Sequence, residues 1–197
     1  SVKSVSMNVE KQTYHHGGLR EALIEAAVQI LEEAGASKMS LRSIARKTGV
    51  SQAAPYSHFS NKNALLIEVA AFGFTKFSDA LEEPVPLSDD TEDLREHLAQ
   101  LGVVYVNFAL ENKALFQLMF GDALSHISKS ETYMREGTRA YDCIDKAVRR
   151  LKDDGAATLA AWSMVHGLAT LMVDQKISPM EDIEKQVRSI LQFLLLN

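Results

Sequence analysis

The sequence has 197 residues, of which 46% are hydrophobic and 24% charged, and its formal net charge is −5. This length suits one large or two small domains, and only ten glycines and four prolines exclude a collagen-like or low-complexity chain. The single cysteine, Cys143, excludes an intramolecular disulfide framework and is typical of a reducing cytosol, so we expect a cytoplasmic protein. The first residues contain no apolar signal core, and Met7 is a candidate natural start, which would make residues 1–6 an addition.

Basic side chains are concentrated near the N-terminus. Residues 1–63 contain eight Lys and Arg against five Glu, whereas the remaining residues contain 13 basic and 21 acidic side chains. Such a chain is not a bulk coat for nucleic acid, but its basic end could present one edge to phosphates.

Helical periodicity runs through the first half of the chain, and no segment alternates apolar and polar residues as a strand would. Residues 19–34 form one amphipathic stripe, and residues 41–48 and 52–58 predict two short helices. A long helix, marked by an apolar stripe of Leu65, Val69, Phe72, Phe77 and Leu81, is expected to start near Asn61. Residues 82–90, EEPVPLSDD, contain two prolines and no periodicity, which predicts a linker.

The second half predicts five more helices, at residues 94–108, 115–120, 134–151, 156–173 and 179–196. Residues 156–173 are apolar nearly all round, so that helix must be covered on more than one side. No uncharged apolar run approaches the ~18 residues of a membrane span, so no membrane span is expected. Ser178-Pro179-Met180-Glu181 predicts a capping box for the last helix. We therefore predict an all-α fold of about nine helices.

Residues 40–51 have the pattern of a helix-turn-helix. Ser40 supplies a hydroxyl cap for the first short helix. A helix-turn-helix needs a small residue where its helices cross, a turn glycine and a buried residue directly after it. Ala45, Gly49 and Val50 meet these needs at suitable spacing, and Ser51 offers a cap for the second helix.

The chain resembles the tetracycline-repressor-like (TetR) family of transcriptional regulators. The similar stretches are YHHG with Leu19-Arg20 at residues 14–20, LRSIA at 41–45, GVS at 49–51, QAAPYSHF at 52–59 with Lys62 and Leu65-Leu66, and WSMVHG at 162–167. The first and last stretches resemble a branch with a YHHG opening and a WHG-type C-terminal domain. The resemblance implies a three-helix DNA-binding head, residues 1–62, and a helical ligand-sensing and dimerisation bundle, residues 63–197.

Three residues depart from the family pattern or strain it. Gly18 stands where that branch often has Asp, so the first helix loses a side-chain cap. The loss costs roughly a few tenths of a kcal/mol. Ser57 replaces the Arg or other large residue often found there, which removes a possible DNA contact. Pro55 lacks an N–H, so the second short helix must start at about Gln52 to keep Pro55 in its first turn.

Side chains at the start of the second helix of such a motif reach base edges. Gln52 lies there and can pair with adenine through two hydrogen bonds. Alternatively, Gln52 is a solvated surface residue. Ala53 and Ala54 could pack on thymine methyls or merely allow close approach. The resemblance implies that Tyr56 and His58 donate to phosphates, although Tyr56 could instead pack in the core. The other predicted DNA-contacting residues are Ser40, Arg42, Ser51, Ser57 and Lys62, with Tyr14 and His16 on an N-terminal arm.

The large aromatic and sulfur-containing side chains of the second half are candidates for a ligand cavity, although we expect most of them to be ordinary core. The candidates are Tyr105, Phe108, Met119, Phe120, Met134, Tyr141, Trp162 and His166, with Met164 and Met172 as weaker ones. Trp162 and His166 lie four residues apart and can face one cavity. Cys143 and the six histidines show no metal-ligand spacing, so we expect no metal and no cofactor.

These patterns predict a cytoplasmic, homodimeric repressor that binds near-palindromic double-stranded operator DNA and a small-molecule effector. The last two helices would pair with their copies as a four-helix interface. One alternative is a helical ligand-binding or interaction module without DNA binding. A second is an enzyme, but no nucleophile–base pair is evident, and Ser163 near His166 is too common a combination to count.

Overall fold

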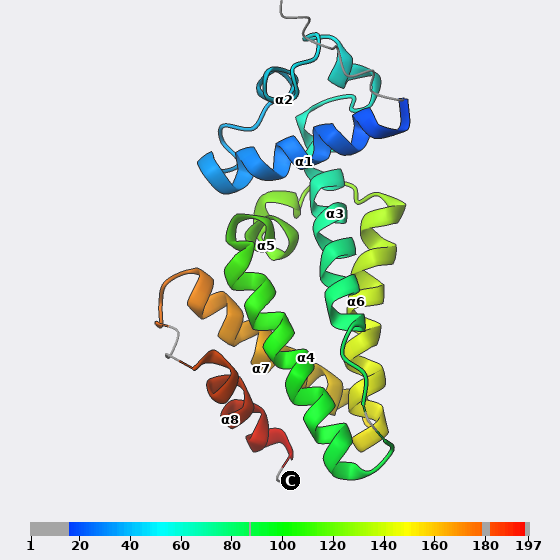
Figure 1. The fold of residues 1–197 in the computed structure, drawn as a ribbon, viewed down its shortest axis with the longest axis vertical. Coiled ribbons are helices and arrows are strands. Elements are labelled where there is room, and N and C mark those ends of the chain that lie inside the picture. Colours follow the sequence, from blue (N-terminus) through cyan, green and yellow to red (C-terminus); the bar gives the residue numbers. More distant parts are fainter. Residues whose placement is uncertain (1–15, 87, 179–181, 196–197) are drawn as a thin grey trace, which may run out of the picture.

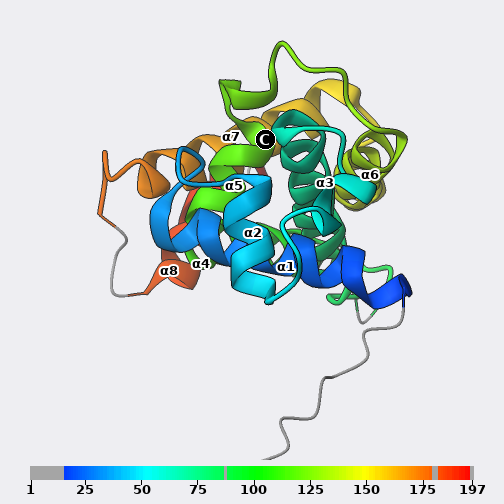
Figure 2. The same ribbon diagram turned by 90° about the horizontal axis from the view of Figure 1, so that it is seen from above.

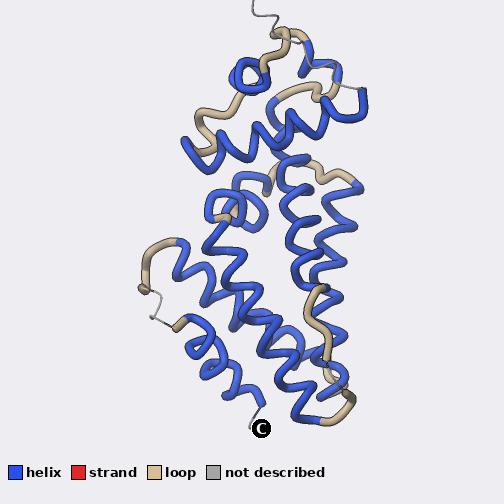
Figure 3. The backbone as a smooth tube through the Cα atoms, viewed as in Figure 1, coloured by secondary structure: helices blue, strands red, loops and turns tan. Residues whose placement is uncertain are grey.

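A computed structural model describes residues 16–86, 88–178 and 182–195. These residues form eight α-helices and two 3₁₀ turns, and none of them lies in a strand (Figure 3). The elements are α1 (His16–Ala34), α2 (Leu41–Thr48), η1 (Ala54–Ser57), α3 (Lys62–Glu82), α4 (Thr91–Glu111), α5 (Lys113–Phe120), η2 (Asp122–Leu124), α6 (Glu131–Leu151), α7 (Gly155–Val173) and α8 (Ile183–Leu195). The all-α prediction is confirmed, whereas the count of nine helices fails because residues 52–58 form only η1.

The helices make a head, consisting of α1, α2 and η1, on one end of a body made of α3 to α8 (Figure 1). α1 lies across the top of α3, and α6 runs beside α3 along the body. Seen from above, α1 and α2 lie in front of the body helices (Figure 2). α3 is common to both parts, because Glu68 in its second turn pairs with Arg20 of α1.

Most helices begin at a side-chain cap, because the first turn of a helix has backbone N–H groups without partners. Capping oxygens at the starts of α2, α3, α4, α6, α7 and α8 belong to Ser40, Asn61, Asp90, Ser130, Asp154 and Asp182. The cap at Asp182 corrects the predicted start of the last helix at residue 179. Residues 179–181 of the proposed capping box lie outside the described residues.

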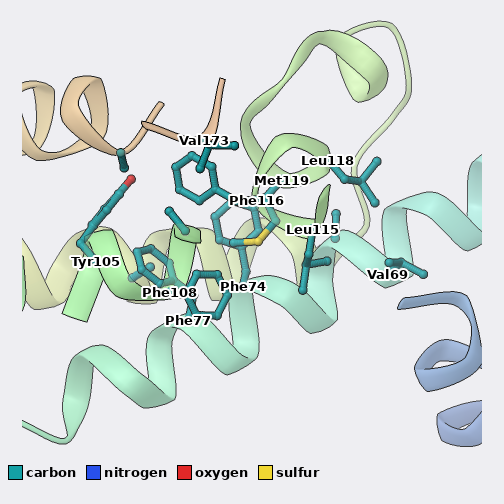
Figure 4. Packing of buried hydrophobic residues seen from close by; sticks show 14 of the residues in the cluster. Val69, Phe74, Phe77, Tyr105, Phe108, Leu115, Phe116, Leu118, Met119 and Val173 are labelled. Atoms are coloured by element: carbon teal, nitrogen blue, oxygen red, sulfur yellow. The ribbon is translucent and has the colours of Figure 1, made fainter. Parts of the chain in front are cut away.

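Aromatic side chains fill the space between the body helices. Phe77 of α3 stacks edge to face against Tyr105 of α4, with ring centroids 4.8 Å apart, and Phe74 meets Phe120 of α5 at 5.2 Å. The close-up in Figure 4 shows Phe74 and Phe77 of α3 close to Phe108 of α4, with Phe116 of α5 nearby. Such edge-to-face pairs add about 0.5–1.5 kcal/mol each to the burial of their area.

Helix α7 is long and apolar enough, by length and composition, to cross a membrane. Residues 155–173 carry no charge, so the sequence-based statement that no uncharged apolar run approaches 18 residues is wrong for this helix. The helix packs against α4, α6 and α8, burying side chains that include Ala161, Val165 and Ala169. The requirement that it be covered on more than one side is thus met by neighbouring helices.

A carboxylate of the head caps the start of α5 in the body. Asn112, which precedes α5, makes no side-chain cap. Instead the Glu32 carboxylate of α1 accepts hydrogen bonds from the backbone N–H groups of Leu115, at 2.8 Å, and Ala114, at 3.1 Å. A negative charge at a helix N-terminus is stabilised by the helix dipole as well as by these donors. Glu32 therefore joins the head directly to the helix that carries Phe120.

Replacing this carboxylate should loosen the junction between head and body. We expect Glu32→Ala to destabilise the protein by about 1 kcal/mol, as loss of an N-cap does, which lowers the melting temperature by about 2–4 °C in a chain of this size. Glu32→Gln keeps an acceptor oxygen and should lose less. Calorimetry of the two variants provides the test, and equal melting temperatures for Glu32→Ala and the parent protein would contradict the cap.

Candidate DNA-binding surface and apolar cavity

The turn after α2 has the geometry that the sequence predicts. Ser40 and Ser43 form a reciprocal capping box, with the Ser43 N–H donating to the Ser40 hydroxyl at 3.0 Å. Leu41, Ile44 and Ala45 are buried on one face of α2. Gly49 has φ +71°, a left-handed conformation that side chains other than hydrogen disfavour.

The segment after this turn is shorter and tighter than predicted. A single 3₁₀ turn, η1, runs from Ala54 to Ser57, and residues 52–53 precede it in a turn closed by the hydrogen bond from the Ala54 N–H to the Ser51 carbonyl oxygen. Pro55 lies in the first turn of η1, as expected, but it is buried. A buried proline without an N–H cannot extend an α-helical ladder, which accounts for one 3₁₀ turn where a helix over 52–58 was predicted.

The predicted base-reading and phosphate-binding side chains lie close together in the chain on this short turn. Gln52 and Ala53 are exposed, and the Tyr56 side chain is 54% exposed, so Tyr56 is not part of the small core. Ala54 and His58 are half-buried. Exposure leaves the amide of Gln52 and the phenol of Tyr56 able to meet an external partner.

Two of the three serines predicted to contact DNA form hydrogen bonds within the head through their hydroxyl groups. Ser40 is half-buried, and its hydroxyl caps α2. The Ser57 hydroxyl donates to the Ala54 carbonyl oxygen at 2.7 Å. Ser51 is exposed, and its carbonyl oxygen accepts from the Ala54 N–H at the start of η1.

The basic side chains of the head differ in whether they already have a partner within the protein. Arg42 projects from the exposed first turn of α2, whereas Lys47 pairs with Glu33 at 2.9 Å. The half-buried Lys62 donates from Nζ to the Ala36 carbonyl oxygen at 2.7 Å, tying α3 to the loop after α1. Tyr14 lies outside the described residues, and His16 is the first residue of α1.

An apolar cavity of about 180 Å³ lies between the body helices. Its lining comes from α3, α4, α5, α6 and α7 and consists of Phe74, Phe77, Tyr105, Phe120, Gly137, Ala140, Tyr141, Ile144 and Trp162. Tyr141 and Trp162 stand edge to face at 5.7 Å, and Tyr141 is 37% exposed, which places this pair where the cavity approaches the surface.

One hydrogen-bonded group lies at the wall of this cavity. Trp162 Nε1 donates to the Tyr105 hydroxyl at 3.1 Å, and that hydroxyl lies 2.8 Å from His166 Nδ1. Burial raises the pKa of Tyr105 and lowers the pKa of His166, so the phenol keeps its proton and the imidazole is neutral near pH 7. Because the hydroxyl already accepts from Trp162, we assign its proton to the hydrogen bond with Nδ1, which puts the imidazole proton on Nε2.

Four of the eight predicted cavity residues line it: Tyr105, Phe120, Tyr141 and Trp162. His166 stands behind Tyr105, with its ring 4.8 Å from that of Phe120. Phe108 and Met119 are buried in the surrounding core. Met134 is a correction, since it is 57% exposed on α6 and contributes nothing to the lining.

Sequence reasoning missed five lining residues: Phe74, Phe77, Gly137, Ala140 and Ile144. The apolar stripe of residues 65–81 contains Phe72 and Phe77, yet Phe72 is only half-buried whereas Phe74 is buried. One sequence pattern could have indicated a cavity beside this helix. Gly137 lies four residues before Tyr141, and Ala140 lies four residues before Ile144, so small and large side chains alternate on one face. That signal is weak, because small residues also mark close packing.

The capped helix, left-handed glycine turn and exposed polar turn define a helix-turn-helix DNA-binding head on an all-helical body. Residues 23–69 match the family profile described as bacterial regulatory proteins of the tetR family, and residues 98–194 match the tetracyclin repressor-like C-terminal domain. The chain belongs to the TetR family of DNA-binding transcriptional regulators, which are not enzymes.

Individual relatives agree with this assignment. The chain is 26% identical over 189 residues to the uncharacterized HTH-type transcriptional regulator YobS of Bacillus subtilis, covering 92% of this chain and 95% of YobS. A protein with unknown function from Rhodococcus sp. RHA1 is 31% identical, with a TM-score of 0.78 over 93% of this chain and 97% of that one. The multidrug binding protein EbrR, solved with imidazole, shares the fold at 16% identity, with a TM-score of 0.61 over 97% of each chain.

Two neutral histidines, the buried His97 and the half-buried His166, make stability depend on pH. Burial lowers the pKa of both His166 and His97, and the Nδ1 of His97 has no hydrogen-bond partner among the described residues. Their stabilising contribution is complete above the unfolded pKa of about 6.5 and is lost as pH falls below it, because the unfolded chain then binds more protons.

We therefore expect the free energy of unfolding, measured in urea at one protein concentration, to be lower at pH 5.5 than at pH 7.5. His97→Leu should reduce this difference, since it removes one of the two groups. His126→Gln replaces an exposed histidine and serves as the control for the substitution itself. A stability that is flat across this interval would show that neither imidazole is held neutral.

Proposed function

We infer that this regulator is a ligand-responsive repressor that binds a near-palindromic operator as a homodimer in the cytoplasm. The observation that carries the DNA-binding part is the exposure of Gln52 and Tyr56 beside the rigid turn at Gly49. Two such heads in a dimer would enter successive major grooves of the duplex. The grooves lie one helical turn apart, about 34–36 Å, or slightly more.

Each head residue has a distinct part in this proposal. Gln52 hydrogen-bonds an adenine edge, since its amide offers a donor and an acceptor side by side. Tyr56 and His58 donate to phosphates, and Arg42 adds a cation on the same motif. Lys62 supports the phosphate contact through its charge while one of its N–H groups holds the Ala36 carbonyl.

Substitutions in the head should separate base reading from phosphate binding. Gln52→Ala should relax preference at one base pair by about 1–3 kcal/mol, whereas Tyr56→Phe should weaken binding to all duplexes alike. Selected operator and random duplex, titrated by fluorescence anisotropy at several salt concentrations, give the readout. Equal losses on both duplexes for Gln52→Ala would remove base reading from that residue.

The same titration decides between this function and a module that has lost DNA binding. Ser57 and the modest positive charge of the head are the features that favour the alternative. Phosphate contacts make the logarithm of the binding constant fall linearly with the logarithm of salt concentration. Absence of any duplex binding at low salt would therefore select the alternative.

The proposed dimer interface uses an apolar stripe of α7 together with α8. Leu159 and Leu171 are 56% and 45% exposed, and they lie on one side of α7 with Ser163 and Gly167 between them. No atom outside α7 lies within 4 Å of where a Gly167 side chain would begin. Exposed leucines separated by small residues suit close approach of a second helix.

A charge placed on this stripe should separate the subunits. We expect Leu171→Glu to give monomers at micromolar concentration in sedimentation velocity, because an unpaired carboxylate would be buried at the interface. Met134→Glu is the matched control, since Met134 is equally an exposed apolar residue but lies on α6. A Leu171→Glu protein that sediments as a dimer would exclude this face.

The cavity is the proposed effector site, and α5 is the proposed link to the head. Phe120 lines the cavity, and the N-terminus of α5 is capped by Glu32 of α1. Occupation of the cavity would favour a conformation with the two heads mis-spaced. Release of DNA then follows from the ligand's higher affinity for that conformation.

A further inference from the structure

The lining of the cavity has an unusual chemical uniformity. Of its nine lining residues six are aromatic, and the other three are Gly137, Ala140 and Ile144. Ring faces and edges from α3, α4, α5, α6 and α7 therefore surround whatever occupies the space. Such walls favour a flat, apolar molecule that can make offset or edge-to-face contacts with several rings.

No charged group is available to a ligand in this cavity. None of the lining side chains carries a charge. Glu136, which is buried beside Gly137, is already paired with Arg135 at 2.9 Å and Arg139 at 3.1 Å. A ligand charge placed here would lose its hydration without gaining a partner, which is strongly unfavourable.

Two of the three lining side chains with a polar group, Tyr105 and Trp162, are also committed, and the third, Tyr141, is 37% exposed where the cavity approaches the surface. The Tyr105 hydroxyl accepts from Trp162 and lies within hydrogen-bond distance of His166. Its one proton and the indole proton are thus both in use, and a ligand gains no unshared donor from them. Recognition therefore rests mainly on shape and apolar contact.

The size of the cavity limits the ligand to a compact one. An engineered apolar cavity of about 150 Å³ stays dry and binds benzene, and the present cavity measures about 180 Å³. A second void, of about 10 Å³, lies among α4, α6, α7 and α8 and shares Tyr105 and Ile144 as walls. Because Tyr105 is held by two hydrogen bonds, this wall closes the cavity against a long chain.

We propose that the cavity selects a neutral, compact, aromatic hydrocarbon-like effector, about one ring with a short alkyl substituent, and rejects charged analogues of the same shape. This proposal rests on the cavity being the effector site of the proposed function. The ligand class follows from two features of the lining, which are its six aromatic side chains and its lack of a charged group.

Binding of n-propylbenzene and two charged analogues tests the ligand class. The only tryptophan of the chain, Trp162, lines the cavity, so its fluorescence reports occupation, and calorimetric titration gives the stoichiometry. We expect one n-propylbenzene per chain, with 3-phenylpropionate and 3-phenylpropylamine at least about 100-fold weaker, because each would bury an unpaired charge. Either charged analogue binding as tightly as n-propylbenzene, or no binding of n-propylbenzene, would overturn the proposal.

Two neighbouring substitutions on α6 locate the binding. A side chain at Gly137 would begin 3.9 Å from the Phe74 ring, an ordinary contact, so Gly137→Leu should fill the cavity while improving helix propensity. We expect this variant to fold, by circular dichroism and thermal unfolding, and to lose n-propylbenzene binding. Thr138→Leu adds the same side chain at an exposed position and should bind normally. Retained binding in a folded Gly137→Leu protein would place the ligand elsewhere.

Duplex binding by the same preparations separates this inference from the proposed function. If n-propylbenzene binds but no duplex does, the regulatory function fails and the ligand class stands. If a duplex binds and only a charged analogue occupies the cavity, the ligand class fails and DNA binding stands. Release of the duplex by n-propylbenzene, but not by the charged analogues, is the result expected when both are correct.

Discussion

Burial of α3 along its whole length is the interaction on which the rest of the structure depends. The helix has 21 residues and so spans about 30 Å at 1.5 Å per residue. Near its start Leu65 and Leu66 are buried below the head, and further along Phe74 and Phe77 form one wall of the cavity. Head and cavity are therefore built on one rigid element, and a change of its tilt would be felt at both ends.

The junction between head and body is reinforced by charge as well as by apolar contact. Glu32 caps α5 from α1, and Arg20 of α1 pairs with Glu68 of α3. Asn112, the residue before α5, does not cap the helix, and Glu32 of α1 caps it instead. Because the start of α5 is capped by a residue of α1, the cap depends on how head and body are placed, which is the physical basis for the proposed link between α5 and DNA release.

The cavity combines an apolar interior with a fixed polar wall. Tyr105, Trp162 and His166 satisfy one another, so the wall is rigid without presenting a charge. Buried polar groups that were not paired would cost more free energy than an apolar replacement. Their mutual pairing lets the protein keep three polar side chains beside a space suited to hydrocarbon.

The sequence by itself determined the features that depend on a few neighbouring residues. Ser40, the stripe in α2 and Gly49 lie within ten residues, and caps, helical periodicity and left-handed turns are set by such local chemistry. The same is true of the helix bounds near Gly35, Asn61 and Gly121.

Only the tertiary structure decided the features that depend on distant neighbours. Pro55 reduces the predicted helix to one 3₁₀ turn where it is buried, and packing of α3 decides that Phe74 rather than Phe72 faces the cavity. Glu32 meets α5 across 83 residues of chain at Leu115. Burial and pairing between distant segments are set by how helices pack, and a periodic pattern identifies an apolar face without naming the surface that will cover it.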